Sequence, residues 1–281
     1  MNWRVVGLKT LGAGGNGDLC VGLRSDTGEQ VVVKFLRESG SAFARKAFER
    51  EVRILRQGLP GMVRLLFADL TATRPYYVMP YLHGGSLEKY AGTLVDGQLH
   101  AVANHVASTL SVLHARNVSH GDIKPANVLV SHDGQLRVAD PLGNGIGCTM
   151  LFSEHHGGTP GYWAPEVMAG NPISCAGDVY SYGATLYELL TGFRPRDGQR
   201  LDQAVAHGAD SPVIRHLVAL CCQNDPGARP TIAEVIRVLQ GELWPQIQAA
   251  RVQRQQFAVA AGIAGILLLM IGLWGDGLGG S

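Results

Sequence analysis

Residues 120–127 read His-Gly-Asp-Ile-Lys-Pro-Ala-Asn, and Asp140 follows a strand-like segment further along the chain. Asp122 and Lys124 lie close in sequence, and Asn127 adds an amide. A carboxylate can orient a hydroxyl group, a lysine can face a transferring phosphate, and amide and carboxylate oxygens are ligands that Mg²⁺ accepts. These four side chains therefore suit the transfer of a phosphoryl group.

A glycine-rich segment lies near the start of the chain, where Gly12, Gly14 and Gly17 have the spacing GxGxxG. This spacing alone is also found in dinucleotide-binding loops, which need a helix directly afterwards. Residues 18–25 instead have the composition of a strand, so the segment is interpreted as a hairpin turn. Backbone N–H groups without neighbouring β-carbons can approach phosphate oxygens closely, so the turn is a candidate phosphate-binding loop.

Lys34 ends the apolar run Val31-Val32-Val33, which predicts a strand. Because a strand alternates its faces, Lys34 can enter a cleft among apolar neighbours, where its charge needs a partner. Glu51, in the helix that follows, is the candidate partner. The alternative interpretation is a solvated surface lysine.

The order of the other segments predicts an α+β fold with a small β-rich part, a larger helical part and a cleft between them. Val- and Leu-rich segments bounded by glycine turns predict strands over residues 4–11, 19–25, 30–36, 63–68, 76–81, 128–131 and 135–139. Apolar residues at helical spacing or long uninterrupted segments predict helices over residues 43–57, 99–116, 178–191, 211–222 and 231–241.

Composition excludes several classes of protein. The chain has 281 residues, of which 46% are hydrophobic, so it is neither disordered nor a small disulfide scaffold. Lys and Arg number 24 against 23 Asp and Glu, a net charge of +1 that predicts no nucleic-acid partner. The five cysteines form no CxxC pair, which favours a reducing compartment over a disulfide or zinc framework. The first residues contain no apolar stretch typical of a cleaved secretory signal.

Residues 257–274 contain no charged side chain and predict a transmembrane helix. Eighteen residues of helix extend over roughly 27 Å, close to the thickness of the hydrocarbon core. Arg251 and Arg254 precede the segment and no basic residue follows it, so we expect a single-pass protein of the inner (plasma) membrane with a cytoplasmic main body. Ala258 and Gly262 are small residues at a spacing that would let two such helices pack together as a homodimer.

In this order and spacing, the motifs resemble those of bacterial eukaryotic-like Ser/Thr protein kinases anchored in a membrane by a C-terminal helix. The resemblance covers residues 3–240 and implies a bilobal protein-kinase fold. It divides the chain into an N-lobe (1–82), a C-lobe (83–241), a juxtamembrane linker (242–256), the transmembrane helix (257–274) and a short outer tail (275–281). The implied activity is transfer of the ATP γ-phosphate, with Mg²⁺ or Mn²⁺, to protein hydroxyls at the cytoplasmic membrane face.

The resemblance also implies a role for each matching position. Asp122 would align the substrate hydroxyl, Lys124 would support the γ-phosphate, and Asn127 and Asp140 would hold the metal ion. The nucleotide-binding positions would be Gly12, Gly14, Gly17, Leu19, Val32, Lys34, Glu51, Met79, Pro80, Leu82 and Leu129. Among these, Met79 occupies the gatekeeper position, and the Pro80 carbonyl and Leu82 N–H would meet adenine.

Three further positions are implied to be structural. Glu166, in the substrate-binding segment Gly-Thr-Pro-Gly-Tyr-Trp-Ala-Pro-Glu of residues 158–166, should pair with Arg229. Asp178 should hold the catalytic loop, residues 120–127, through backbone N–H groups.

The sequence departs from the family pattern at several positions. Gly121 replaces the arginine that usually meets a phosphorylated activation loop, so loop phosphorylation is a weaker candidate for the switch. Pro141 replaces a phenylalanine, and either Leu142 restores the lost apolar contact or the segment has less freedom to move. Val32 is larger than the usual alanine and would narrow the adenine pocket. The candidate phosphosites are Thr149, Ser153 and Thr159.

Two alternatives remain open on the sequence alone. The altered residues after Asp140 would suit a pseudokinase that acts as a membrane-tethered binding module, although every charged residue needed for transfer is present. The His120-Gly121-Asp122 sequence also matches small-molecule phosphotransferases of the aminoglycoside or choline kinase type. Against that class stand residues 158–166 and 224–231, which resemble peptide-binding and structural motifs of protein kinases.

Overall fold

The computed structural model describes residues 3–14, 17–37, 42–143, 160–204, 211–250 and 252–253. The chain forms two compact units, Met1–Leu239 and Gln240–Ser281, which are described separately. The predicted transmembrane helix 257–274 and the candidate phosphosites Thr149, Ser153 and Thr159 lie outside the described residues. Within the described residues, every helix is too short or too polar to cross a membrane.

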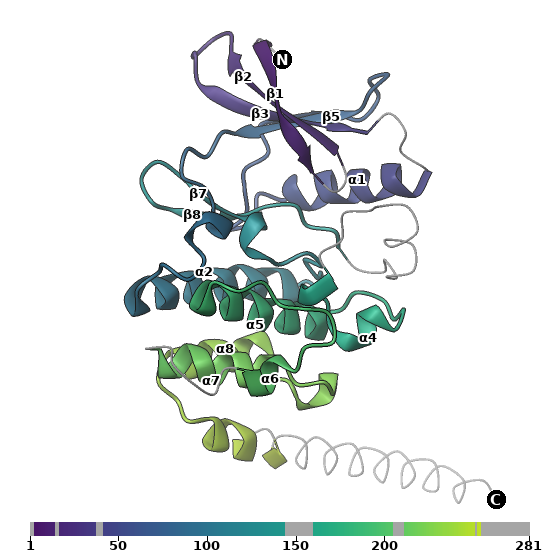
Figure 1. The fold of residues 1–281 in the computed structure, drawn as a ribbon. Coiled ribbons are helices and arrows are strands. Elements are labelled where there is room, and N and C mark those ends of the chain that lie inside the picture. The colour runs from purple at the N-terminus through teal and green to yellow at the C-terminus, as the bar shows by residue number, and fades with distance from the viewer. Residues whose placement is uncertain are drawn as a thin grey trace, which may run out of the picture. The chain divides into compact units, whose positions relative to one another are not determined.

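The first unit begins with a five-stranded antiparallel sheet in the order β1-β2-β3-β5-β4, drawn at the top of Figure 1. Its strands are β1 (Val5–Gly14), β2 (Gly17–Arg24), β3 (Gln30–Leu36), β4 (Phe67–Asp69) and β5 (Tyr76–Pro80). The first three strands and the glycine-rich hairpin were predicted from the sequence. The fourth strand begins later than predicted, because the Val63 N–H donates to Val138 of another sheet rather than to β5.

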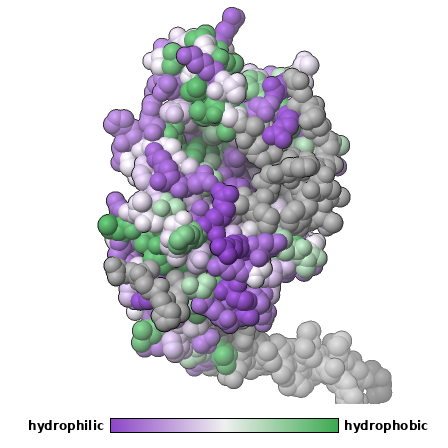
Figure 2. All heavy atoms as spheres, viewed as in Figure 1, coloured by the Kyte–Doolittle hydropathy of each residue, from purple (hydrophilic) through white to green (hydrophobic). Residues whose placement is uncertain are grey.

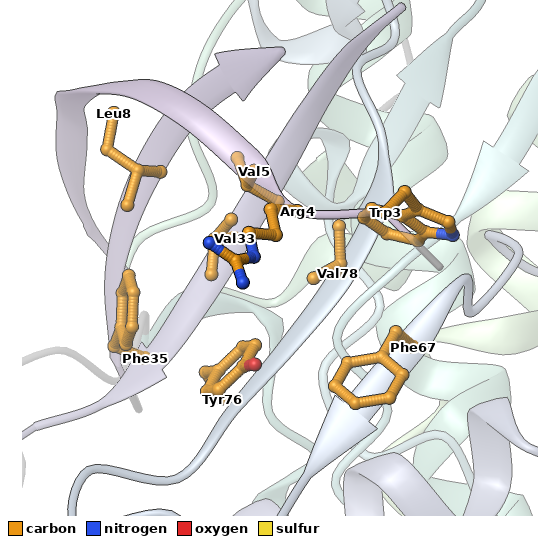
Figure 3. A pocket seen from close by; sticks show the side chains of 9 residues that line it. All are labelled: Trp3, Arg4, Val5, Leu8, Val33, Phe35, Phe67, Tyr76 and Val78. Carbon is orange, nitrogen blue, oxygen red and sulfur yellow. The ribbon is translucent and has the colours of Figure 1, made fainter. Parts of the chain in front are cut away.

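Successive side chains of each strand point to opposite faces of this sheet, so the two faces pack against different parts of the chain. One face packs on the helix α1 (Ala42–Leu55), which lies below the sheet in Figure 1. The other face carries an apolar cluster centred on Val31, Val33 and Val78. Trp3 and Phe67 complete the wall of a cavity of about 270 Å³ on that outer face (Figure 3).

A second, three-stranded sheet connects to the helical part, which confirms the bilobal architecture. This sheet has the order β6-β7-β8 and comprises β6 (Gly85–Ser86), β7 (Val128–Val130) and β8 (Leu136–Val138). The α-helices of this part are α2 (Asp96–His114), α4 (Pro165–Met168), α5 (Cys175–Thr191), α6 (Leu201–Ala204), α7 (Pro212–Cys221) and α8 (Ile232–Leu239). The 3-10 helices are η1 (Leu87–Tyr90), η2 (Pro125–Asn127), η3 (Pro160–Tyr162) and η4 (Pro226–Ala228).

The helix α5 is the central element of the helical part, since most of its side chains are buried. It begins three residues earlier than the sequence predicted. Ser174 caps its N-terminus, and the Ser174 Oγ accepts a hydrogen bond from the Gly177 N–H at 3.1 Å. Gly192 ends the helix in a left-handed conformation with φ 77°. The cap places Asp178 in the first turn, below the catalytic loop.

Figure 2 shows how polar and apolar residues are distributed on one face of the first unit. Apolar residues gather at the top, over the first strands, and hydrophilic residues run down the middle of this face. The exposed apolar side chains of the first two strands are Val6, Leu8, Leu11 and Leu23. In the second unit, the described residues 244–250 form a helix.

Candidate active site

The inner face of the five-stranded sheet brings several predicted nucleotide-binding residues into adjacent rows. Leu19 of β2 pairs with Lys34 of β3, and Lys34 pairs with Tyr77 of β5. Directly paired residues of antiparallel strands point to the same face. The next row contains the pair Val32 and Met79, both 5% exposed. The sheet thus presents one lysine, surrounded by apolar side chains, to the helix α1.

Lys34 lies between two carboxylates at the centre of the site. Its Nζ is 2.7 Å from the Glu51 Oε1 and 3.1 Å from the Asp140 Oδ2. Burial alone would lower the pKa of Lys34, but the charges of Asp140 and Glu51 outweigh it and raise that pKa above its usual value. The Lys34–Glu51 ion pair was predicted from the sequence and is confirmed. Its second partner connects the sheet to the helical part.

Asp140 follows β8 and has a left-handed backbone, with φ 58°. Burial alone would raise the pKa of Asp140, but the charges of Lys34 and Lys124 outweigh it and keep the pKa below its usual value. The carboxylate is therefore ionised at neutral pH. Lys34 belongs to the sheet and Lys124 to the catalytic loop, so a charge from each of these segments stabilises the Asp140 carboxylate.

The catalytic loop holds Asp122 with two side chains from the same short stretch. Lys124 Nζ lies 2.8 Å and 3.0 Å from the two carboxylate oxygens of Asp122. Asn127 Nδ2 donates to the Asp122 carbonyl and to its Oδ2, both at 2.7 Å. The Asp122 side chain is 19% exposed, so it is held in place and still accessible. This arrangement is suited to accepting a hydrogen bond from an incoming hydroxyl group.

The loop backbone is fixed from below by Asp178, as the sequence predicted. The N–H groups of His120 and Gly121 donate to the two carboxylate oxygens of Asp178, both at 2.7 Å. His120 is fully buried; its Nδ1 accepts the Asp122 N–H at 3.2 Å, so its Nε2 donates to the Ala139 carbonyl at 3.0 Å. Burial lowers the pKa of His120, which fits this neutral tautomer.

The glycine-rich segment is a hairpin in the structure, as predicted. Gly14 pairs with Gly17, and Gly12 pairs with Leu19, across β1 and β2. A β-carbon at Gly17 would come within 2.4 Å of the Phe35 carbonyl, so this position requires glycine. Beside Gly12, no atom of the described residues lies within 4 Å of an added β-carbon. The hairpin therefore leaves open space at the position where the resemblance places phosphates.

The remaining predicted nucleotide-binding residues lie along the connection between the two lobes. Pro80 ends β5, and the Leu82 carbonyl accepts the N–H of Gly85 at 3.0 Å just before β6. Leu129 lies in β7, opposite Ser86 of β6. Their part in binding adenine stays a prediction.

Asn127 and Asp140 are suited to holding a divalent cation. Both supply oxygen donors, which hard cations such as Mg²⁺ prefer. The two hydrogen bonds from Nδ2 orient the Asn127 amide and leave its oxygen as the group for a ligand. The Asp140 side chain is 28% exposed and ionised. The donor set therefore fits Mg²⁺, and the assignment of these two residues remains a prediction.

The segment after Asp140 is tied to both lobes despite its unusual sequence. Leu142 is buried, and its N–H donates to the His120 carbonyl at 2.7 Å. A β-carbon at Gly143 would lie 2.7 Å from the Arg50 side chain of α1. Pro141 is also buried. Both the catalytic loop and α1 therefore contact this segment.

The ion pair between Glu166 and Arg229 is present as predicted. Two guanidinium nitrogens of Arg229 donate to the two Glu166 oxygens at 2.7 Å and 2.8 Å. The Arg229 side chain is completely buried and also donates to the carbonyls of Gln223 and Ala176. It joins α4 to the first turn of α5.

Two residues of this region were not identified from the sequence. Tyr77 donates its hydroxyl to the Glu51 Oε1 at 2.6 Å. The His114 Nε2 lies 2.9 Å from the Asp178 Oδ2. Tyr77 could have been found from its position two residues before Met79, on the same face of the strand. His114 and Asp178 are 64 residues apart, and no local pattern connects them.

Comparison with known proteins agrees with this geometry. Residues 5–239 match the protein kinase domain family. The chain is 32% identical over 257 residues to the probable serine/threonine-protein kinase PkwA of Thermomonospora curvata, across 84% of this chain and 34% of that protein. It is 33% identical over 217 residues to the serine/threonine-protein kinase Pkn1 of Myxococcus xanthus, across 73% and 31% respectively. The chain thus spans about a third of the length of these relatives. Its sequence and its bilobal fold show that it belongs to the protein kinase family.

Proposed function

We propose that this chain transfers the γ-phosphate of ATP to serine and threonine hydroxyls of proteins. The observation that carries the proposal is the position of Lys34, which contacts Glu51 at 2.7 Å and Asp140 at 3.1 Å. Residues far apart in sequence are thereby joined across the two lobes, next to the catalytic loop that holds Asp122. Protein kinases use ATP with Mg²⁺, and the donor set of this site suits both.

The role of Asp122 follows from its surroundings. Its carboxylate is held by Lys124 and Asn127 and remains accessible, so it can accept a hydrogen bond from a substrate hydroxyl. This hydrogen bond would align the hydroxyl oxygen for attack on the phosphate, and the Asp122 carboxylate would receive the hydroxyl proton as the transfer proceeds. The ammonium group of Lys124 can then offset the negative charge that develops beside Asp122.

Lys34 would bind and orient the α- and β-phosphates from the opposite side. Its charge is maintained by two carboxylates, and burial leaves little freedom for its position. When bound, Mg²⁺ neutralises charge on the phosphates and helps to hold them in line. The contribution of the chain is therefore mainly positioning and charge stabilisation, which a loose phosphoryl transition state requires.

The catalytic loop and the names of the relatives support a preference for Ser and Thr. Lys124, followed by Pro125, has the pattern that the resemblance assigns to Ser/Thr kinases, whereas tyrosine kinases usually lack this lysine. The relatives PkwA and Pkn1 are both described as serine/threonine-protein kinases.

A transfer assay tests the proposal and separates it from the two alternatives. The full chain, purified in mild detergent, is incubated with γ-labelled ATP and Mg²⁺, either with a generic protein acceptor or with aminoglycosides and choline. The proposal expects label on Ser and Thr residues of the protein acceptor. Label only on the small molecules would indicate a small-molecule phosphotransferase. ATP binding without transfer would indicate a pseudokinase.

We also propose that residues 257–274 hold the kinase domain at the cytoplasmic face of the inner membrane. The support is the uncharged segment with Arg251 and Arg254 on one side alone. In membrane fractionation, the full chain should resist extraction with alkaline carbonate, and a chain that ends at Gln256 should not. Equal extraction of both would contradict the anchor. The small residues Ala258 and Gly262 suggest a homodimer of this helix.

A further inference from the structure

Tyr77 of β5 is completely buried next to Lys34. It is the cross-strand partner of Lys34, so both side chains project from the same face of the sheet toward α1. Its exposed fraction is 0%, and its hydroxyl donates to the Glu51 Oε1 at 2.6 Å. Lys34 approaches the same oxygen at 2.7 Å. One carboxylate oxygen of α1 is therefore held by two neighbouring strands.

The ring of Tyr77 provides a second contact with the same helix. Its centroid lies 5.4 Å from that of Phe48. Phe48 and Glu51 are three residues apart in α1 and share one face of the helix. Tyr77 therefore contacts α1 through its ring at Phe48 and through its hydroxyl at Glu51. A rigid side chain with two contacts restricts both sliding and rotation of the helix.

The charges around Lys34 explain why Glu51 needs a restraint to stay in its ion pair with Lys34. Glu51, which is buried, and Asp140, which is partly exposed, both contact the ammonium group of Lys34, and their like charges repel each other. Lys34 could satisfy its charge with Asp140 alone if α1 moved away. A hydrogen bond from Tyr77 stabilises the carboxylate of Glu51 at the position where it meets Lys34. Burial raises the pKa of the Tyr77 hydroxyl, which therefore remains a donor.

We propose that Tyr77 is a positioning residue that fixes Glu51 of α1 in its ion pair with Lys34, so that Lys34 is oriented toward the phosphates of ATP. The proposal deepens the proposed function and rests on it. The neighbouring residue Tyr76 offers a matched control, because it projects from the opposite face of β5. There it lies 5.6 Å from Phe35 and 6.0 Å from Phe67, ring centroid to ring centroid, beside the outer cavity (Figure 3).

The first test compares the binding of ATP with that of adenosine, by calorimetry in the presence of Mg²⁺. Tyr77→Phe removes only the hydroxyl and keeps the ring against Phe48, so the fold should persist. ATP affinity should fall about tenfold, the usual scale for a lost hydrogen bond to a charged group. Adenosine affinity should not change, because adenosine has no phosphates for Lys34 to bind. Tyr76→Phe should change neither affinity. Equal weakening of both ligands by Tyr77→Phe, or of neither, would overturn the proposal.

The second test is a double-mutant cycle in the transfer assay. In the wild-type background, Tyr77→Phe should lower kcat/KM for ATP about tenfold. In a Glu51→Gln background, the same substitution should have a much smaller effect, because the charged group that Tyr77 orients is gone. Equal effects in both backgrounds would assign Tyr77 a general structural role and contradict the proposal. If the wild-type chain binds ATP but transfers no phosphate, the proposed function fails, and the ATP and adenosine comparison still decides the role of Tyr77.

Discussion

Lys34 is a charged side chain that is only 1% exposed, and it remains charged because two carboxylates surround it. Removing a buried charge from such a cluster lowers the free energy of unfolding more than removing an exposed charge. Glu51 would be left buried without a counter-charge, and Asp140 would keep only the more distant charge of Lys124. Substitution of this lysine therefore changes stability as well as nucleotide binding, and the two effects need to be separated.

We expect Lys34→Met to lower the free energy of unfolding by about 3–5 kcal/mol, since it removes the cation that pairs with the buried carboxylate of Glu51 and with the partly exposed carboxylate of Asp140. Adding Glu51→Gln to this variant should restore part of the lost stability, because one of the two charges is removed. Neither variant should transfer phosphate. Urea denaturation of the three proteins measures the effect. A Lys34→Met variant as stable as the wild type would contradict this account of the cluster.

The backbone at Gly121 favours glycine over a residue with a side chain. Its φ is 84°, and an added β-carbon would lie 3.0 Å from the Ile173 Cδ1 and 3.2 Å from the Leu142 Cβ. The backbone conformation and the neighbours therefore both disfavour a side chain. The N–H of the same residue donates to Asp178, so a shift of the backbone would also reach the catalytic loop.

Gly121→Ala should lower the free energy of unfolding by at least about 1–2 kcal/mol, the cost of a left-handed conformation with a β-carbon. It should also lower the transfer rate. Gly134→Ala is a matched control, because Gly134 has φ 78° and, in the part of the chain that the structure describes, no atom lies within 4 Å of an added β-carbon. The control should lose stability and keep its activity. Equal losses of stability and activity in both variants would show that crowding at Gly121 has no effect.

Among the contacts between helices, an ion pair between His114 and Asp178 joins the end of α2 to the start of α5. His114 lies at the C-terminus of α2, where a positive charge is favourable, and Asp178 lies in the first turn of α5. Burial alone would lower the pKa of His114, but hydrogen bonds to Asp178 and Cys175 outweigh it and raise the pKa to about 9. The pair also supports the carboxylate that holds the catalytic loop.

This pair gives the protein a pH-dependent stability. Because the pKa of His114 is higher in the folded state than its usual value of 6.5, its contribution is complete below about pH 6.5 and is lost as the pH rises through about 9. The loss amounts to at most about 3 kcal/mol. Urea denaturation between pH 6 and pH 9.5 should show a steeper decline for the wild type than for His114→Gln, because buried groups such as the thiols of Cys221 and Cys222 also lower the stability of both proteins at high pH. Parallel curves for the two proteins would contradict the assignment.

Arg229 joins α4 to α5 through a fork of hydrogen bonds that lysine cannot reproduce. Arg229→Lys keeps the charge but loses the bidentate contact with Glu166 and hydrogen bonds to buried carbonyls, so it should lower the free energy of unfolding by about 1–3 kcal/mol. Arg45→Lys alters an exposed pair with Glu49 in α1 and should change stability little. Thermal unfolding compares the two variants. Similar small changes in both would show that burial does not strengthen the Arg229 pair.

The sequence predicted the elements whose signals are local and the ion pairs that belong to a motif. The glycine hairpin, the strand that ends at Lys34 and the pairs Lys34–Glu51 and Glu166–Arg229 are examples. It did not predict contacts that depend on strand register, such as Tyr77 with Glu51, or on the packing of distant helices, such as His114 with Asp178. The early start of α5 depends on the Ser174 cap, which a pattern of apolar residues does not indicate.

At the scale of the molecule, the site is assembled from both lobes of the first compact unit. The sheet supplies Lys34, α1 supplies Glu51, and the loops around β7 and β8 supply Asp122, Asn127 and Asp140. None of these segments could form the site alone. The altered residues after Asp140 leave the charged groups in place, which favours an active kinase over a binding module.

The most direct measurement is Mg²⁺-dependent transfer of labelled γ-phosphate to a protein acceptor by the full chain and by its Asp122→Asn variant. Asp122 is partly exposed, so this substitution should preserve folding and ATP affinity. The account predicts label on Ser and Thr residues with the wild type and a rate at least about 100-fold lower with the variant, the scale of a lost general base. ATP binding by both proteins with equal transfer, or with no transfer by either, would contradict it.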